Sequence, residues 1–399
     1  MSSGITLTAA TRQSLLALQN TASQTSTIQN QLSTGKKVNS ALDNPISFFT
    51  SQSLTQRSGD LSNLLDGISN GIQAIQAANQ GITSIQSLVS QAKSIANQAL
   101  STQITTTGTA SAAYTAPTGA TTVNLYVNGA ATSVSLASGN TIDQTITALN
   151  ASVGAGSFTK STDGTKIVMN AQSDVEFKTS TDQTALGFAG NSTAGTTYGT
   201  SGATVASVAQ SSDLSVSGVS ARSTLAQQYN SLLTQIDQLA QDSSFNGTNL
   251  IAGKGSNNNL TINFNPKGNS NLTVSATDET SAGLKLSAIQ GGSLAGGLGQ
   301  GNFLLNADIN TTLNSLTSAS SQLRTDASTL GSNLSVVQNR QSFSNNLINI
   351  LDTGSSNLVN ADMNEAAANS QALSTRQSLG ISALSLANTA QQGVLQLLR

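Results

Sequence analysis

The sequence contains no cysteine, no histidine and no tryptophan among its 399 residues. The first two absences exclude thiol nucleophiles, Ser-His-Asp triads and the usual zinc ligands. Disulfide bonds are excluded too, so stability must come from packing and assembly. Carboxylate catalysis and calcium binding stay open, but the 18 acidic residues are scattered along the chain. This composition favours a protein that is not an enzyme and holds no metal.

Charged and aromatic residues are also scarce, at 9% and 3% of the chain. The formal net charge is −2, so we expect no basic surface for nucleic acid. The few aromatic rings cannot form a platform on which bases stack. A surface of low charge repels its own copies weakly, which suits a protein that packs against itself.

Long hydrophobic runs are missing as well. No stretch of 18 apolar residues occurs, so the sequence predicts no membrane-spanning helix. The first 20 residues hold one basic residue, Arg12, and no continuous apolar core, unlike a cleaved secretory signal. These general rules predict a cytoplasmic protein, an expectation that the family resemblance below reverses.

Both ends of the chain carry long heptad patterns instead. Along residues 61–99 an apolar residue recurs every seven positions, and a second row follows three residues later. A matching seam runs through residues 316–358. Sustained heptads require a partner helix, because an apolar stripe cannot remain in water alone. We therefore expect the two regions to pair as a long antiparallel coiled coil or helical rod.

Residues 5–34 are predicted to form a helix that stops at Gly35. Its contact face is expected to hold Leu15, Leu18, Ala22 and Leu32. Thr25 and Gln29 interrupt this frame, and Ile28 falls one place outside it. The predicted contact face therefore holds few apolar residues, and we expect the helix to be stable only when other helices pack against it.

Other helices flank the heptads. Asn44 is expected to cap a helix that begins at Pro45 and leads into the first heptad region. One more helix is predicted from Val219, and another over residues 365–398. The basic segment 35–37 has two interpretations, a solvated loop, which we favour, and a recognition patch.

Residues 105–215 are predicted to form a small inserted α+β domain. Alternating runs on either side of Asn128-Gly129 are typical of a hairpin. A second hairpin is expected over residues 158–169, a strand at 175–178 and a helix at 141–151. The mainly helical chain thus gains a β-containing part in its middle.

Two connectors and one further hairpin complete the prediction. Residues 101–117 are rich in Thr, Ser, Ala and Gly and are predicted to be a connector. Residues 260–274 are predicted to form a β-hairpin beside the rod. The glycine-rich residues 291–301 lack the Lys-Ser or Lys-Thr of a phosphate-binding loop, which favours a second connector.

Five segments resemble motifs of bacterial flagellin and occur in the expected order. They are LSTGKKVNSALDN at 32–44, FNGTNL at 245–250, the pattern LG to QNR at 330–340, NADM at 360–363 and QGVLQLLR at 392–399. The resemblance covers about residues 1–105 and 220–399, and the middle matches only loosely. Each motif alone is modest, but five in order are specific to the family.

The resemblance implies a structural subunit that polymerises into the flagellar filament, without catalysis or a cofactor. Residues 1–42 and 358–399 would form the filament core, residues 43–105 and 220–357 a helical rod with its hairpin, and residues 106–219 a surface-exposed insert. Its implied partners are further copies of the chain, the type III export apparatus, an export chaperone, and the cap and hook–filament junction proteins. Export without a cleaved signal would make the protein extracellular.

Contacts between copies are expected to bury apolar side chains, each contributing about 1.5 to 3 kcal/mol before entropy. A thinly apolar inner helix such as 5–34 is expected to be disordered in a free monomer and to become ordered on assembly. The predicted subunit-packing residues are Leu15, Leu18, Leu32, Leu61, Ile68, Ile75, Ile82, Leu330, Val337, Leu384, Leu395 and Leu398.

Four other functions were weighed. A hook–filament junction protein would share the terminal helices, but the ending QGVLQLLR and Asn246–Asn249 favour the filament subunit. The insert of a filament subunit could also act as a surface adhesin. A type III translocator would need long apolar segments, and a metalloprotease insert would need histidine, and both are missing.

Overall fold

The computed structural model describes residues 9–127, 130–192, 210–253, 258–289, 303 and 306–397. Helices predominate in these residues. The chain divides into two compact units, each described here by itself. Unit 1 comprises Met1–Ser69, Asn263–Asn271 and Gln338–Arg399, and unit 2 comprises Asn70–Ile262 and Leu272–Val337. The division cuts the two longest helices, α2 (Pro45–Ser101) and α6 (Asn306–Val359).

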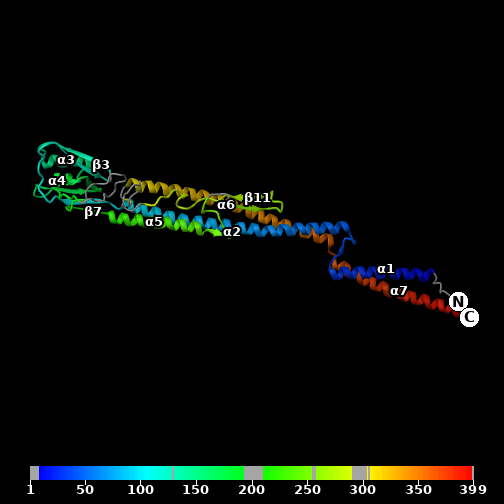
Figure 1. The fold of residues 1–399 in the computed structure, drawn as a ribbon. Coiled ribbons are helices and arrows are strands. Elements are labelled where there is room, and N and C mark those ends of the chain that lie inside the picture. Colours follow the sequence, from blue (N-terminus) through cyan, green and yellow to red (C-terminus); the bar gives the residue numbers. More distant parts are fainter. Residues whose placement is uncertain are drawn as a thin grey trace. The chain divides into compact units, whose positions relative to one another are not determined.

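Unit 1 contains two pairs of helices. The first pair is α1 (Ala9–Thr34) and α7 (Met363–Leu397), which lie side by side at the two chain termini (Figure 1). The second pair is the start of α2 and the end of α6. Ser51 Oγ lies 2.8 Å from Ser355 Oγ, and Leu54 lies beside Gly354, so this second pair is antiparallel. Further along α2, Lys93 contacts Thr317 of α6, so the two heptad regions pair as predicted.

The helical layer of unit 2 adds a third helix, α5 (Val219–Asp242), to α2 and α6. Its apolar stripe is buried at Leu225, Tyr229, Leu232, Leu233 and Ile236. The side of α2 in this unit is correspondingly apolar and buried, with Ile75, Ile82 and Ile85 fully enclosed. Lys93 Nζ also donates to Thr317 Oγ1 over 3.2 Å, which joins α2 to α6.

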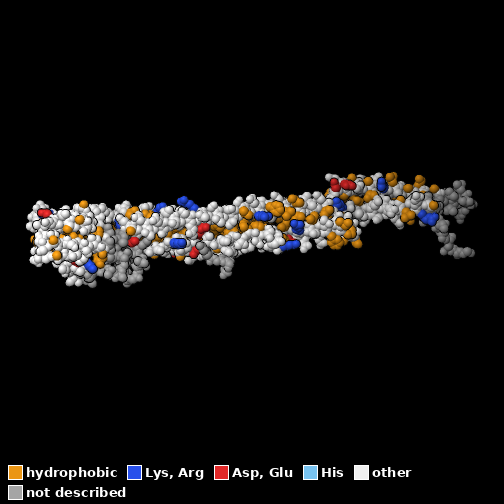
Figure 2. Space-filling model, turned by 90° about the horizontal axis from the view of Figure 1, so that it is seen from above, with side chains coloured by type: hydrophobic (Ala, Val, Ile, Leu, Met, Phe, Trp, Pro, Cys, Tyr) orange, Lys and Arg blue, Asp and Glu red, His pale blue; other side chains and the backbone are white. Residues whose placement is uncertain are grey.

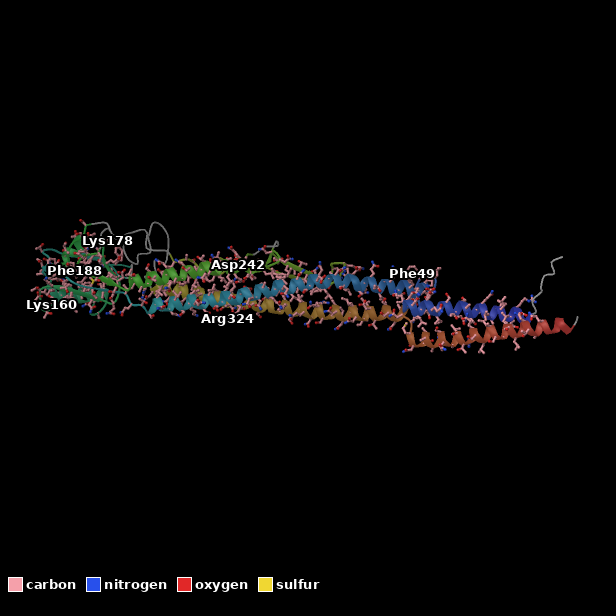
Figure 3. All side chains as sticks on the ribbon, turned by 90° about the horizontal axis from the view of Figure 1, so that it is seen from below. Phe49, Lys160, Lys178, Phe188, Asp242 and Arg324 are labelled. Carbon is pink, nitrogen blue, oxygen red and sulfur yellow. The ribbon has the colours of Figure 1, made fainter. Side chains whose placement is uncertain are left out.

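The insert is built from two antiparallel sheets and two short helices (Figure 1). One sheet has the order β4 (Phe158–Lys160), β5 (Ile167–Ala171), β1 (Thr105–Thr109) and β7 (Leu214–Ser217). The other has the order β3 (Ala130–Leu136), β2 (Thr121–Val127) and β6 (Val175–Phe177). Helices α3 (Ile142–Val153) and α4 (Ser180–Ala185) accompany them. Phe158, Phe177 and Phe188 lie in the shared core, and Figure 3 labels the last of these.

Short hairpins follow α5. The strands β8 (Ser244–Phe245) and β9 (Thr248–Asn249) form a tight turn, and β10 (Leu260–Asn263) pairs with β11 (Asn271–Val274). The predicted hairpin at 260–274 is thereby confirmed. Within unit 1, the Arg340 guanidinium of α6 lies 5.5 Å from the ring centroid of Phe264, at the tip of this hairpin.

Most predicted elements are present, and one prediction is wrong. The segment 101–117, predicted as a connector, contains β1, which pairs with both β5 and β7. Its sequence TTTGT has no apolar alternation, so strand formation there depends on its two neighbours. The residues of the Asn128-Gly129 turn and the glycine-rich 291–301 lie outside the described residues.

Candidate assembly surface

The contact face of α1 differs from the predicted frame. The buried and half-buried positions alternate in steps of three and four along Thr11, Ser14, Leu18, Thr21, Thr25, Ile28 and Leu32. Ile28, predicted to be out of frame, is therefore in it, whereas Leu15 and Ala22 are exposed. The frame prediction was wrong because polar residues hold four of the seven contact positions. Apolarity alone consequently does not reveal the frame.

α7 presents two apolar faces, and α1 covers only one of them. The covered face follows Ala366, Ser370, Leu373, Gln377, Gly380, Leu384 and Ala387. Leu379 and Leu386 are 64% and 72% exposed. At about 100° per residue they lie roughly 120° to 140° around the helix from Leu373. A helix with apolar residues on more than one side normally needs more than one partner.

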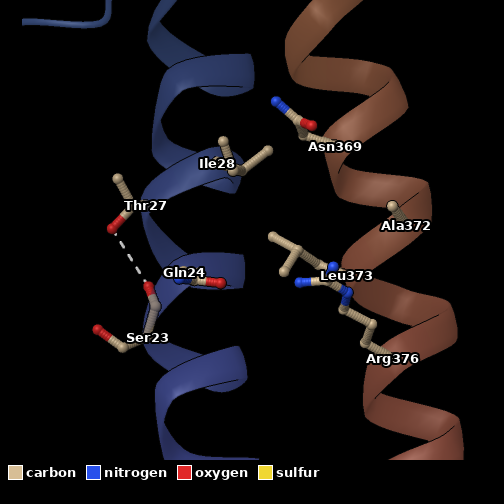
Figure 4. Close-up of a pocket in the computed structure, with 8 residues that line it drawn as sticks. All are labelled: Ser23, Gln24, Thr27, Ile28, Asn369, Ala372, Leu373 and Arg376. Carbon is tan, nitrogen blue, oxygen red and sulfur yellow. Dashed lines mark hydrogen bonds between the residues drawn. The ribbon is translucent and has the colours of Figure 1, made fainter.

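The α1–α7 pair is also loosely filled. A groove of about 390 Å³ lies between the two helices (Figure 4). Its lining residues are Ser23, Gln24, Thr27, Ile28, Asn369, Ala372, Leu373 and Arg376. Polar side chains therefore occupy most of the space that apolar knobs fill in a tight coiled coil. A Cβ atom at Gly380 would lie 2.7 Å from Leu18 Cδ1, so close approach occurs at that glycine.

The basic segment 35–37 caps the end of α6. The main-chain N–H groups of Lys37 and Val38 donate to Val359 O over 2.7 and 3.2 Å, and Lys37 Nζ donates to Asn357 O over 3.0 Å. Ala361 N donates in return to Gly35 O over 2.9 Å. A cation near the carboxyl end of a helix satisfies its last carbonyls and its dipole. The favoured interpretation, a solvated loop, missed this capping role.

An amide side chain caps the N-terminus of α2, and a carboxylate caps the N-terminus of α7. Asn44 Oδ1 accepts from Ser47 N over 3.0 Å, which confirms the predicted cap of α2. Asp362 Oδ1 accepts from Asn364 N over 2.9 Å and so caps α7. Hydrogen bonds from the N–H groups of Ser40 and Asn39 hold the pKa of Asp43 below its usual value. The motif residues of 32–44 and 360–363 thus build the junction of four helix ends, those of α1, α2, α6 and α7.

Exposed apolar side chains are concentrated in unit 1. The large exposed ones among the described residues are Leu15, Leu16, Leu42, Ile46, Phe49, Val336, Phe343, Ile350, Met363, Leu379, Ile381 and Leu386. Only Val336 belongs to unit 2, which leaves eleven of these twelve in unit 1. Phe49, labelled in Figure 3, is 59% exposed on α2. Hydrophobic side chains show on the surface in Figure 2, whereas the surface of the insert is mostly white.

The twelve predicted subunit-packing residues fall into three groups. Leu61, Ile68, Ile75, Ile82, Leu330 and Val337 are buried inside the chain itself. Leu18, Leu32 and Leu384 are half-buried, and Leu15 is 38% exposed. The side chain of Leu395 and the whole of Leu398 lie outside the described residues. The heptad rows therefore stabilise the single chain, and the free apolar surface lies elsewhere.

Two structural residues were not predicted. Arg222 is buried at the start of α5, where Nε donates to Thr102 O over 2.7 Å and Nη1 to Phe303 O over 3.1 Å. It thereby joins Thr102, the residue after α2, to α5 and to Phe303, which precedes α6 by three residues. Gly81 of α2 lies against Ser243 and Ile251. Nothing in the local sequence around either residue indicates these long-range contacts.

Neither a membrane-spanning helix nor a cluster of metal ligands occurs among the described residues. None of their helices is long and apolar enough to cross a membrane. Within the same residues, no three acidic side chains converge as metal ligands.

Comparisons with known proteins agree with this geometry. The N-terminal helical region of bacterial flagellin matches residues 5–117, and the C-terminal helical region matches residues 313–398. Flagellin C of Rhizobium meliloti (strain 1021) is 46% identical over 19% of this chain and 24% of its own length. Flagellin of Brucella melitensis biotype 1 is 27% identical over 42% of this chain and 59% of its own length. Flagellin FljM of Caulobacter vibrioides is 28% identical over 44% and 59% respectively.

These matches span less than two thirds of each relative's length. The matched regions nevertheless contain α1, α2, most of α6 and α7, which are the helices that build unit 1 and its exposed apolar surface. They also contain four of the five motifs recognised in the sequence. The chain belongs to the bacterial flagellin family.

Proposed function

We propose that the chain is a structural subunit that polymerises into the bacterial flagellar filament, and that unit 1 supplies its main contacts with other copies. The observation that carries this proposal is the concentration of exposed apolar side chains in unit 1. A soluble monomer rarely exposes that much clustered apolar surface without a partner. Further copies of the same chain are the partner that the family implies.

The proposal divides the apolar residues between two tasks. The buried heptad rows, such as Ile68 and Val337, hold each chain together. The exposed residues, such as Leu15, Leu379 and Leu386, contact neighbouring copies. The proposal further requires that the exposed face of α7 contact a different face of the neighbouring copy. Contacts between unlike faces produce an open helical fibre when their rotation does not close a ring.

The domain roles follow from the same proposal. Residues 1–42 and 358–399 would form the filament core, residues 43–105 and 220–357 the surrounding rod, and residues 106–219 the outer surface. The protein would act outside the cell in swimming motility. It would reach that place through the flagellar type III export apparatus, with an export chaperone, and would meet the cap and hook–filament junction proteins. The relatives named above are flagellins, which favours the filament subunit over the junction protein.

Removal of either terminal region tests the proposal. Chains lacking residues 1–42 or 358–399 are expected to lose fibre formation and to leave a soluble, folded remainder, because unit 2 has its own core. Negative-stain microscopy after addition of seeds or precipitant gives the readout, and circular dichroism verifies folding. Fibres formed by both truncated chains at the yield of the full chain would contradict the proposal.

A further inference from the structure

One segment of unit 2, which we name the strap (residues 276–289), is fastened across α5. Ser281 donates to Asp237 from its N and Oγ atoms over 2.7 and 3.0 Å. Asn230 binds both main-chain groups of Ile289, over 2.6 and 2.8 Å. Leu284 and Leu286 of the strap are buried. The strap thus lies in the core of the helical layer as an ordered element, although it has no regular secondary structure.

Glu279 is the fully buried residue of the strap, with 0% of its surface exposed. Its main-chain N–H donates to Ile251 O over 2.8 Å, which fixes its position. Neither of its carboxyl oxygens accepts a hydrogen bond of ordinary length and angle from a described residue, although the nearby Thr277 side chain acts to lower its pKa. Its carboxyl group instead interacts with another carboxyl, that of Asp326 on α6. Two facing carboxyl groups without a donor between them are stable only when a proton lies between them.

The charged surroundings of Glu279 are entirely acidic. Asp326 reaches it from α6 and Asp278 from the strap itself, and no lysine or arginine acts on it among the described residues. Asp237, on α5, is engaged by Ser281. Burial, reinforced by Asp326, raises the pKa of Glu279 from 4.5 to about 7. The proton is therefore retained in mildly acidic solution and lost around neutrality.

We propose that the proton held by the Glu279 carboxyl group fastens the strap to α6 by bonding it to Asp326, and that loss of this proton loosens the strap. The carboxyl pair then makes the helical layer of unit 2 sensitive to pH, with acid tightening it. This inference concerns unit 2 alone and does not depend on the proposed polymerisation.

The direction follows from proton linkage. In the open strap Glu279 is in water and loses its proton above about pH 4.5. In the closed strap Glu279 keeps this proton up to about pH 7. The equilibrium constant for strap opening therefore rises as the pH rises from about 4.5 to about 7, by up to tenfold per pH unit. Above that range it becomes constant. Over the whole range the opening constant is expected to rise on the order of 100-fold.

Hydrogen exchange of the full-length monomer at several pH values tests the proposal. Peptides covering the strap are compared between the wild type and Glu279→Gln at each pH, so that the intrinsic exchange chemistry cancels. The Gln amide can donate to Asp326 at every pH, so opening of the strap in Glu279→Gln should not depend on pH. The opening constant of the wild type divided by that of Glu279→Gln is therefore expected to rise on the order of 100-fold between about pH 5 and about pH 7.5. Asp326→Asn removes the smaller cause of the raised pKa of Glu279 but leaves its burial, so the pH dependence of strap opening should become weaker without disappearing.

Asp352→Asn is the matched control, because Asp352 is an exposed acid of the same helix α6. In this variant, the opening constant of the strap should depend on pH as it does in the wild type. A wild-type to Glu279→Gln ratio that stays flat across the range would overturn the proposal. Protection of the wild-type strap restored at about pH 7.5 by calcium at about 1 mM, but not in Glu279→Gln, would also overturn it, because the pair would then hold a cation.

Discussion

The double variant Leu379→Gln with Leu386→Gln is expected to fold normally and to stop polymerising at concentrations where the wild type forms fibres. Both side chains are exposed on α7 and face away from α1, so the fold of the single chain barely depends on them. If a neighbour buries both, their replacement costs about 4 kcal/mol per subunit, at about 2 kcal/mol each. The critical concentration for polymerisation should then rise about 1,000-fold.

Sedimentation of seeded samples over a range of concentrations measures this effect. The control is Leu379→Met with Leu386→Met, which keeps the volume and apolar character of both side chains and should polymerise nearly as the wild type does. Equal critical concentrations for the Gln and Met variants would show that these two residues face solvent in the polymer as well.

A second large effect is expected at Gly81, in the middle of α2. A Cβ atom there would collide with Ser243 Oγ and would lie 2.7 Å from Ile251 Cδ1. Ser243 cannot move freely, because its Oγ donates to Leu239 O over 2.6 Å at the end of α5. Gly81→Ala should therefore lower the free energy of unfolding by about 2 to 3 kcal/mol, even though alanine favours a helix.

Gly67 gives the matched comparison on the same helix. Nothing lies within 4 Å of a Cβ atom placed there. Gly67→Ala should accordingly raise the free energy of unfolding by about 0.5 to 1 kcal/mol, because alanine is the better helix former. Urea unfolding followed by circular dichroism measures both variants. A free energy of unfolding raised by both substitutions would mean that Ser243 and Ile251 do not pack closely against Gly81.

The sequence predicted those parts of the fold that local rules determine. The heptads of 61–99 and 316–358 required partner helices, and their rows are buried as a helix pair demands. Asn44 and Pro45 set the start of α2 through capping chemistry, which needs only neighbouring residues. The hairpins of the insert followed from alternation on either side of turn residues.

Features that depend on distant contacts could not be predicted in this way. The strand β1 exists because β5 and β7 flank it, and the capping role of Lys37 depends on Asn357, far along the chain. Glu279 stands in a polar stretch that resembles a surface loop, yet it is fully buried. Half of the predicted subunit-packing residues were placed on the heptad rows, whose side chains are buried within the chain, whereas the exposed apolar residues lie mainly outside these rows. Heptad periodicity indicates that a face is buried, but it does not say whether the partner belongs to the same chain.

The central claim is that the terminal helices α1 and α7 obtain their full packing from other copies of the chain. Hydrogen exchange of these two helices, measured in the free monomer and in the sedimented polymer, tests it most directly. The claim predicts fast exchange throughout α1 and α7 in the monomer and strong protection in the polymer. Equal, strong protection of both helices in a monomer that stays monomeric at high concentration would contradict it.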